Sequence, residues 1–141
     1  MLYIEAPAGV GYSYGETVKD RTYDDTISAK DNLEGILAWF EKFPEYQGHD
    51  LYISGESYGG IYVPLVSYNI DQYNEEYADD DSVFKPNLKG FMVGNGVTNW
   101  EYDTTPAFVQ LAYDECLFDT PLMDTIKELG CKYGYAHPFI H

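Results

Sequence analysis

The sequence predicts an α/β fold in which a mostly parallel sheet is flanked by helices. Three short apolar segments with strand character alternate with two long segments of helical periodicity, in the order strand, helix, strand, helix, strand. Strands that are separated by helices pair in parallel through right-handed crossovers. The 141 residues, of which 45% are hydrophobic, suffice for one compact domain and are too few for two.

The first apolar segment, Met1–Ile4, predicts a buried strand that ends at a loop beginning with Glu5. A domain rarely begins inside a buried strand, and no signal peptide precedes this one, so we expect the true N-terminus to lie further upstream. The following Gly9-x-Gly11 lacks the helix and the lysine that a phosphate-binding loop requires. We therefore interpret it as a structural loop that borders a cleft.

A helix is predicted over Thr22–Phe43. Asp24 and Asp25 suit its first turn, where carboxylates meet the positive end of the helix dipole, and Pro44 ends it. One face of this helix is apolar and consists of Leu33, Ile36, Leu37 and Phe40.

The second strand is predicted over Asp50–Ser54, and a tight turn over residues 55–60 leads into a helix over Ile61–Tyr73. Pro64 is expected near the start of this helix, where a missing N–H group matters least. The apolar face of the helix consists of Leu65, Val66 and Ile70.

An acidic loop is predicted over Asn74–Asn87. Its run of three aspartates lacks the alternating ligand spacing of a calcium loop, so we interpret it as a solvated connection. The third strand is predicted over Leu88–Val93 and is followed by Gly94-Asn95-Gly96. We favour a tight turn there over a ligand site at the carboxyl end of the sheet. In the remainder of the chain, the clearest helix is predicted over Leu122–Leu129.

The charge of the chain excludes some classes of partner. A net charge of −16 and a sequence pI of about 4.2 describe a surface that repels phosphate groups. Such a surface argues against nucleic-acid binding and against docking on anionic membranes. It tolerates an acidic compartment, because self-repulsion weakens as the pH falls. No segment is apolar and long enough to span a membrane.

The two cysteines, Cys116 and Cys131, have a spacing that fits no zinc pattern. A disulfide between them would close a short loop and contribute about 3 kcal/mol in the chain-entropy model. Two buried free thiols are an equally good interpretation. The sequence contains no Asn-x-Ser/Thr acceptor for N-glycosylation, and we expect no metal and no cofactor.

Chemistry is indicated by Gly55-x-Ser57-x-Gly59, the pattern of a nucleophile elbow. In such an elbow the nucleophile lies on a strained turn between a strand and a helix, and small neighbours let the backbone fold tightly. The helix N-terminus directs N–H groups at the place where an oxyanion develops, and the N–H of Tyr58 is the expected donor. The alternative is a plain strand-to-helix turn with a capping serine. We favour a nucleophile, because an apolar strand and an amphipathic helix flank the motif.

The chain resembles the serine carboxypeptidase family in several blocks that occur in the family's order. The resemblance runs from the first residues past Gly96 and weakens after Trp100. It implies a partial α/β-hydrolase fold that is truncated at both ends. Residues 1–97 would hold the core sheet and helices of this single partial domain, and residues 98–141 would begin a lid-like helical region. The matching blocks are Leu2–Tyr14 (LYIEAPAGVGYSY), Phe43–Tyr46 (FPEY), Leu51–Pro64 (LYISGESYGGIYVP), Asn87–Phe91 (NLKGF) and Gly94–Gly96 (GNG).

The family removes single residues from peptide C-termini through an acyl-enzyme, usually in acidic secreted or lysosomal and vacuolar compartments. The resemblance implies that Ser57 is the nucleophile and that Glu56 hydrogen-bonds the terminal carboxylate of a peptide or protein substrate. Two acids bind one another in this way only while they share a proton, which favours activity at low pH. The structural alternative for Glu56 is an acid stabilised by the dipole of the next helix.

A serine nucleophile needs a base, and the base needs an orienting acid, in this fold in the order Ser, Asp, His. His49 precedes Ser57 and is excluded by that order. The residues that formally satisfy it are Asp114, Asp119 and Asp124 with His137 and His141. The family's Asp and His follow later strands, however, and no strand is predicted after Val93. We therefore expect the triad partners and the upstream oxyanion donor to be absent from this chain.

Three hypotheses about function follow. The chain is an internal segment of a full carboxypeptidase, a short inactive relative that binds peptides or a protein partner, or part of an acyltransferase of the same family. We favour the first, because a sheet cut on both sides exposes apolar strand edges and invites aggregation. The sequence sets no oligomeric state.

Overall fold

The computed structural model describes residues 1–100 and 103–130, which fall into two compact units that divide between Gly96 and Val97. The first unit contains η1 (Lys19–Arg21), α1 (Asp25–Lys42), η2 (Pro44–Tyr46), β1 (Leu51–Glu56), α2 (Gly59–Glu76) and β2 (Leu88–Gly94). The second contains α3 (Thr105–Asp114) and α4 (Thr120–Glu128).

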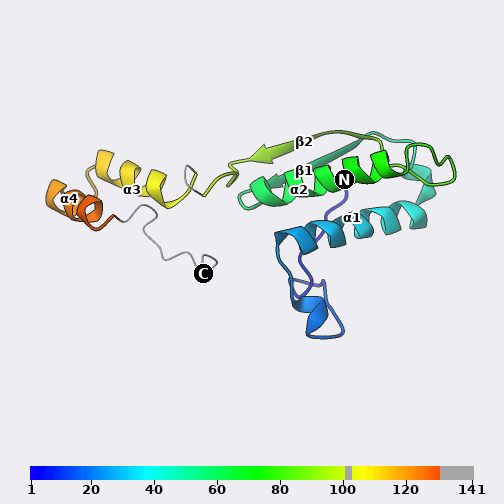
Figure 1. Ribbon diagram of the computed structural model, residues 1–141, viewed down its shortest axis with the longest axis horizontal. Coiled ribbons are helices and arrows are strands. Elements are labelled where there is room, and N and C mark those ends of the chain that lie inside the picture. Colours follow the sequence, from blue (N-terminus) through cyan, green and yellow to red (C-terminus); the bar gives the residue numbers. More distant parts are fainter. Residues whose placement is uncertain (101–102, 131–141) are drawn as a thin grey trace. The chain divides into compact units, whose positions relative to one another are not determined.

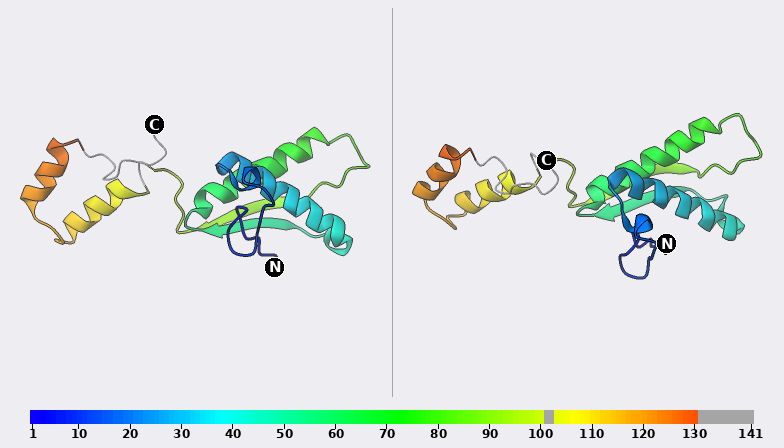
Figure 2. Two further views of the ribbon diagram at one scale, coloured as in Figure 1. Left: turned by 90° about the horizontal axis from the view of Figure 1, so that it is seen from below. Right: turned by 60° about the horizontal axis from the view of Figure 1, so that its bottom comes forward.

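The first unit is a strand–helix–strand arrangement with one additional helix. β1 and β2 pair in parallel, with Ile53 opposite Phe91 and Gly55 opposite Val93. The connecting helix α2 packs against both strands and against α1. Figure 1, together with the turned views of Figure 2, shows both helices on the same side of the two strands. The predicted α/β class with parallel pairing is therefore confirmed.

The core lies where the apolar faces of α1 and α2 meet the inner face of the strands. Its buried residues include four that were predicted to lie on the apolar faces of the two helices: Ile36 and Phe40 of α1, and Val66 and Ile70 of α2. Three strand residues pack against this cluster, namely Leu51, Ile53 and Leu88. The outer face of the strand pair is uncovered among the described residues: Tyr52 is 55% exposed and Met92 is 57% exposed.

The predicted buried strand over Met1–Ile4 is wrong. This segment forms no strand in the structure, and its side chains are exposed, from 45% for Leu2 to 84% for Tyr3 and 106% for Met1. A strand is stabilised by backbone hydrogen bonds to a neighbour, and the described residues offer this segment no pairing strand. The apolar composition of the segment does not indicate whether a neighbouring strand is present to pair with it.

The predicted helices form, with shifted boundaries. Helix α1 begins at Asp25 because Asp24 caps it: the side chain of Asp24 accepts a 2.8 Å hydrogen bond from the N–H of Ile27. Helix α2 extends beyond its predicted range at both ends. Pro64 consequently lies in the second turn and not at the start, so the carbonyl of Gly60 lacks its usual helical donor.

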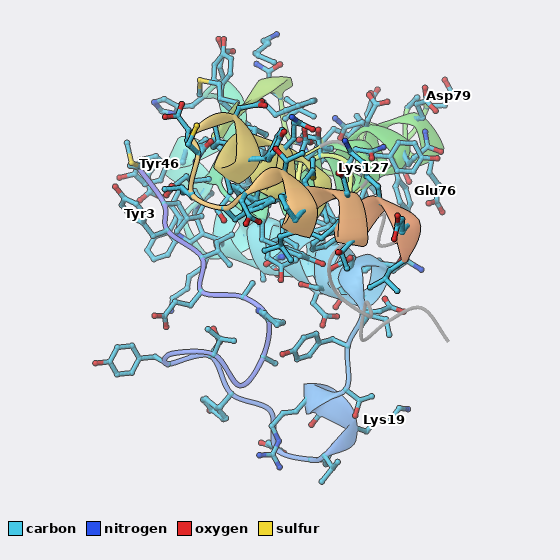
Figure 3. The ribbon with its side chains drawn as sticks, turned by 90° about the vertical axis from the view of Figure 1, so that its left-hand side faces the viewer. Tyr3, Lys19, Tyr46, Glu76, Asp79 and Lys127 are labelled. Atoms are coloured by element: carbon cyan, nitrogen blue, oxygen red, sulfur yellow. The ribbon has the colours of Figure 1, made fainter. Side chains whose placement is uncertain are left out.

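The acidic loop after α2 is organised by one cation. Lys85 Nζ donates hydrogen bonds to the carbonyl oxygens of Tyr77 at 3.1 Å and Asp80 at 2.7 Å. The pKa of Asp80 is lowered chiefly by hydrogen bonds from the side chain and backbone of Ser82. Figure 3 shows Glu76, the last residue of α2, and Asp79 projecting from the ribbon in this region.

The second unit consists of two short helices. Asp119 caps α4, because its side chain accepts a 3.1 Å hydrogen bond from the N–H of Leu122. Met123 is the buried residue of α4. Cys116 is exposed, whereas Cys131 lies outside the described residues.

Within the described ranges, no helix has the length and apolarity that crossing a membrane requires.

Candidate active site

The candidate site is built on the junction between β1 and α2. β1 ends at Glu56 and α2 begins at Gly59, so two residues make the entire turn. Ser57 has a φ of 58°, a left-handed conformation that is uncommon and strained for a residue with a side chain. The turn leaves Ser57 exposed to solvent at the carboxyl end of the strand. This backbone is the geometry that a nucleophile elbow requires.

Gly55 is required by the close approach of α2 to the strand. A Cβ atom at this position would lie 2.8 Å from Val63 Cγ2 and 3.3 Å from the Cα of Gly59. The first distance is shorter than real Cβ contacts, so a side chain at Gly55 would push the helix away from β1. Gly59 is different, because a Cβ there would meet Val63 Cγ2 at 3.8 Å, an ordinary contact.

The end of β2 holds the elbow from the other side. The N–H of Ser57 donates a 3.1 Å hydrogen bond to the carbonyl oxygen of Gly94. Two residues later, a Cβ atom at Gly96 would lie 3.2 Å from the Cα of Gly60 and would collide with the side chain of Val93. The turn after β2 therefore lies directly against the first turn of α2. Gly96 is needed for this packing, whereas the sequence predicted only a tight turn there.

Glu56 and Tyr58 flank the serine and have different surroundings. Glu56 is exposed, and strand alternation places it on the face opposite Gly55, away from α2. Tyr58 is half-buried. Its hydroxyl donates to the carboxylate of Asp25, with distances of 3.2 Å to Oδ1 and 3.1 Å to Oδ2. Burial and then this hydrogen bond raise the pKa of Tyr58 to about 12 from 10.0.

No histidine of the described residues lies beside the serine. His49 precedes β1, and its Nδ1 atom lies 3.3 Å from the carbonyl oxygen of Tyr46. Because a strand rises about 3.3 Å per residue, the full length of β1 separates His49 from Ser57. His137 and His141 lie outside the described residues.

The three aspartates that the order Ser, Asp, His admits lie in the second unit. Asp114 accepts a 2.7 Å hydrogen bond from Gln110 Nε2. Asp119 caps α4, and Asp124 is exposed on the same helix. Within residues 1–100 and 103–130, no three metal-ligating side chains converge.

The loop with Gly9 and Gly11 is folded around Glu5. One carboxylate oxygen of Glu5 accepts a 2.6 Å hydrogen bond from the N–H of Tyr12, and its carbonyl accepts one of 2.5 Å from Ser13 Oγ. Both glycines have positive φ, 97° and 56°, so the loop needs them for its backbone. An open cavity of about 350 Å³ lies between this loop and α1. Residues of the elbow do not line it.

Sequence reasoning missed Asp25 as a partner of the elbow. The residue was expected only as an acid in the first turn of a helix, and no local pattern connects it with a tyrosine 33 positions later. The sequence also predicted only a tight turn at Gly96, and not a contact between Gly96 and α2. Both relationships are long-range, so a single sequence contains no signal for them.

Comparisons with known proteins agree with this architecture. The family profile described as serine carboxypeptidase matches residues 1–138. Serine carboxypeptidase 24 of Arabidopsis thaliana is 46% identical over 107 residues, which are 74% of this chain and 22% of that protein. Serine carboxypeptidase-like 41 of the same plant is 37% identical over 141 residues, covering 98% of this chain and 29% of the relative. The chain therefore spans about a quarter of the length of these relatives.

A solved structure supports the fold. Kex1(Δ)p, a prohormone-processing carboxypeptidase from Saccharomyces cerevisiae, aligns with a TM-score of 0.62 at 23% identity over 84% of this chain and 25% of the yeast chain. The fold and the elbow define part of an α/β-hydrolase. With the family profile covering almost the whole chain, the protein belongs to the serine carboxypeptidase family.

Proposed function

We propose that this chain is the nucleophile-bearing segment of a longer serine carboxypeptidase that releases C-terminal residues from peptides. Ser57 attacks the scissile carbonyl and forms an acyl-enzyme, which water then hydrolyses. The N–H of Tyr58 donates to the oxyanion of the tetrahedral intermediate. The observation that carries this proposal is the positive φ of Ser57 at a two-residue strand-to-helix turn.

Glu56 is proposed to bind the terminal carboxylate of the substrate. It directly precedes Ser57 and is exposed on the far face of β1, so it is accessible to a ligand beside the serine. A glutamic acid in this role holds the substrate carboxylate through one shared proton. Peptide or protein C-termini are thus the proposed substrates, in a secreted or vacuolar and lysosomal setting.

The remaining catalytic groups are proposed to come from other parts of the longer protein. The described residues bring no base to Ser57, and a serine without a base and a second oxyanion donor loses most of its reactivity. Residues 98–141 are proposed to begin a lid-like helical region beside the core in residues 1–97. An acyltransferase would use the same residues and would differ only in that another acceptor replaces water in the attack on the acyl-enzyme.

The mass of the native protein tests the proposal. An antibody against the acidic loop should detect a band well above 16.1 kDa in extracts of the source cells. That longer protein should react rapidly with a fluorophosphonate probe, and Ser57→Ala should abolish the reaction. Ser54→Ala is the matched control, because Ser54 is an exposed serine on β1, the strand that leads into the elbow.

Other outcomes redirect the proposal. A band at 16.1 kDa without labelling would favour the short inactive relative that binds peptides or a protein. Labelling that transfers to an added alcohol or amine acceptor in preference to water would favour the acyltransferase.

A further inference from the structure

A side-chain hydrogen bond connects the elbow to α1. Asp25, the first residue of α1, accepts the hydroxyl hydrogen of Tyr58 with both carboxylate oxygens, at 3.2 Å and 3.1 Å. Tyr58 directly follows the proposed nucleophile, and its backbone N–H is the proposed oxyanion donor. We infer that Asp25 is a positioning residue: it holds the phenol of Tyr58 and thereby sets where the N–H of Tyr58 points. This inference rests on the proposed function.

Tyr58 is held at both ends of its side chain. Its backbone is the N-cap of α2, where its carbonyl accepts a 2.9 Å hydrogen bond from the N–H of Ile61. Its ring packs against Tyr62, one turn further along α2, with the ring centroids 4.8 Å apart. A tyrosine side chain has only two rotatable torsions before the ring. Fixing the hydroxyl on Asp25 therefore restricts the backbone of Tyr58 as well.

Asp25 is itself a firm anchor. The preceding Asp24 caps α1 through a 2.8 Å hydrogen bond to the N–H of Ile27, and its carbonyl accepts a 2.9 Å bond from the N–H of Ser28. Ser28 and Ala29 are 2% and 1% exposed, so the first turn of α1 is seated in the core. Tyr58 is thus tethered to a helix turn that has its own cap and its own buried residues.

The catalytic consequence follows from where an oxyanion donor acts. A donor must lie within about 2.7–3.1 Å of the developing oxyanion, and removing one costs about 10²–10³ in rate. A displaced donor retains part of its effect, so we expect loss of the tether to lower kcat about tenfold. KM should change little, because the donor acts mainly on the transition state.

The test uses the longer native protein with Asp25→Ala, Tyr58→Phe and the double variant. Each single variant should lower kcat about tenfold, and the double variant should be no slower than either single one, because both remove the same tether. Asp25→Asn retains an acceptor oxygen and should restore most of kcat. The control is Asp50→Ala, since Asp50 accepts a 2.7 Å hydrogen bond from Asn87 Nδ2 at the opposite end of β1.

The control separates positioning from plain stabilisation. A purely structural link would lower the melting temperature in Asp25→Ala and Asp50→Ala alike and leave kcat at the wild-type value in both, which would overturn the inference. Additive losses in the double variant would overturn it too. An inactive wild-type protein would contradict the proposed function and remove this inference with it, whereas an active wild type with unchanged variants would contradict the inference alone.

Discussion

The backbone N–H of Ser57 donates a 3.1 Å hydrogen bond to the carbonyl oxygen of Gly94. The strained turn of the elbow is therefore continuous with the parallel ladder between β1 and β2. Two residues beyond that carbonyl, the backbone of Gly96 lies against Gly60 in the first turn of α2. The conformation of the nucleophile thus depends on the carboxyl end of the neighbouring strand as well as on its own motif.

Gly96→Ala tests the contact between the turn after β2 and α2. The added Cβ would lie 3.2 Å from the Cα of Gly60 and would collide with Val93, so we expect a loss of about 1–3 kcal/mol in the free energy of unfolding of the native protein. Gly35→Ala is the control, because a Cβ at this position of α1 meets nothing within 4 Å. It should raise stability by about 0.5–1 kcal/mol. Urea unfolding measures both, and equal midpoints would refute the contact.

The two elbow glycines should respond differently to alanine. At Gly55 the new Cβ would lie 2.8 Å from Val63 Cγ2, whereas at Gly59 the distance is 3.8 Å. Gly55→Ala should therefore destabilise the native protein by about 1–3 kcal/mol, and Gly59→Ala should stay within about 1 kcal/mol of the wild type. Thermal unfolding of the two variants side by side provides the measurement. A larger loss for Gly59→Ala would contradict the packing described for the elbow.

The raised pKa of Tyr58 predicts an alkaline transition. The folded-state pKa of about 12 exceeds the ordinary value of 10.0, so the unfolded state releases this proton first. The stability contributed by the neutral phenol is fully present below pH 10.0 and is lost as the pH rises through about 12. A titration of ¹³Cζ-labelled tyrosine by NMR should show this late transition for the resonance of Tyr58, and Asp25→Ala should lower the pKa of Tyr58. A wild-type spectrum in which Tyr58 titrates near 10 would contradict the prediction.

Glu56→Gln tests recognition of the substrate carboxylate. An amide retains a donor at every pH, so the variant should lose much of its preference for acidic pH in kcat/KM toward peptides. Glu34→Gln is a suitable control, because Glu34 is an exposed glutamate on α1. Comparable pH profiles for wild type and Glu56→Gln would remove Glu56 from substrate binding.

The uncovered face of the strand pair predicts how the isolated chain behaves. Tyr52 and Met92 are each more than half exposed on neighbouring strands, and such a surface promotes association. The 141-residue chain should therefore form oligomers or aggregates in size-exclusion chromatography at micromolar concentration, and Met92→Lys should reduce them. Leu129→Lys, in which the exposed residue lies after a helix, should have little effect. A monodisperse monomeric wild type would favour the short relative.

Local patterns in the sequence determined most of the secondary structure. The helical spacing of Ile36 and Phe40, which are four residues apart in the sequence, identified the inner face of α1, because burial selects one side of a helix whatever lies opposite. The elbow motif located Ser57 because the motif lies within one short strand-to-helix segment, where Gly55 admits the close approach of Val63. The alternation of strands and helices was enough to predict parallel pairing.

Tertiary structure decided whatever depends on a distant partner. The apolar Met1–Ile4 segment is exposed and unpaired within the described residues, because a strand is defined by its neighbour and not by its own composition. The tether from Tyr58 to Asp25 spans 33 residues, and the contact of Gly96 with Gly60 exists only once β2 has paired with β1. The sequence alone determined which residue is placed on the strained turn, and the packing of α1, α2 and β2 decided what holds it there.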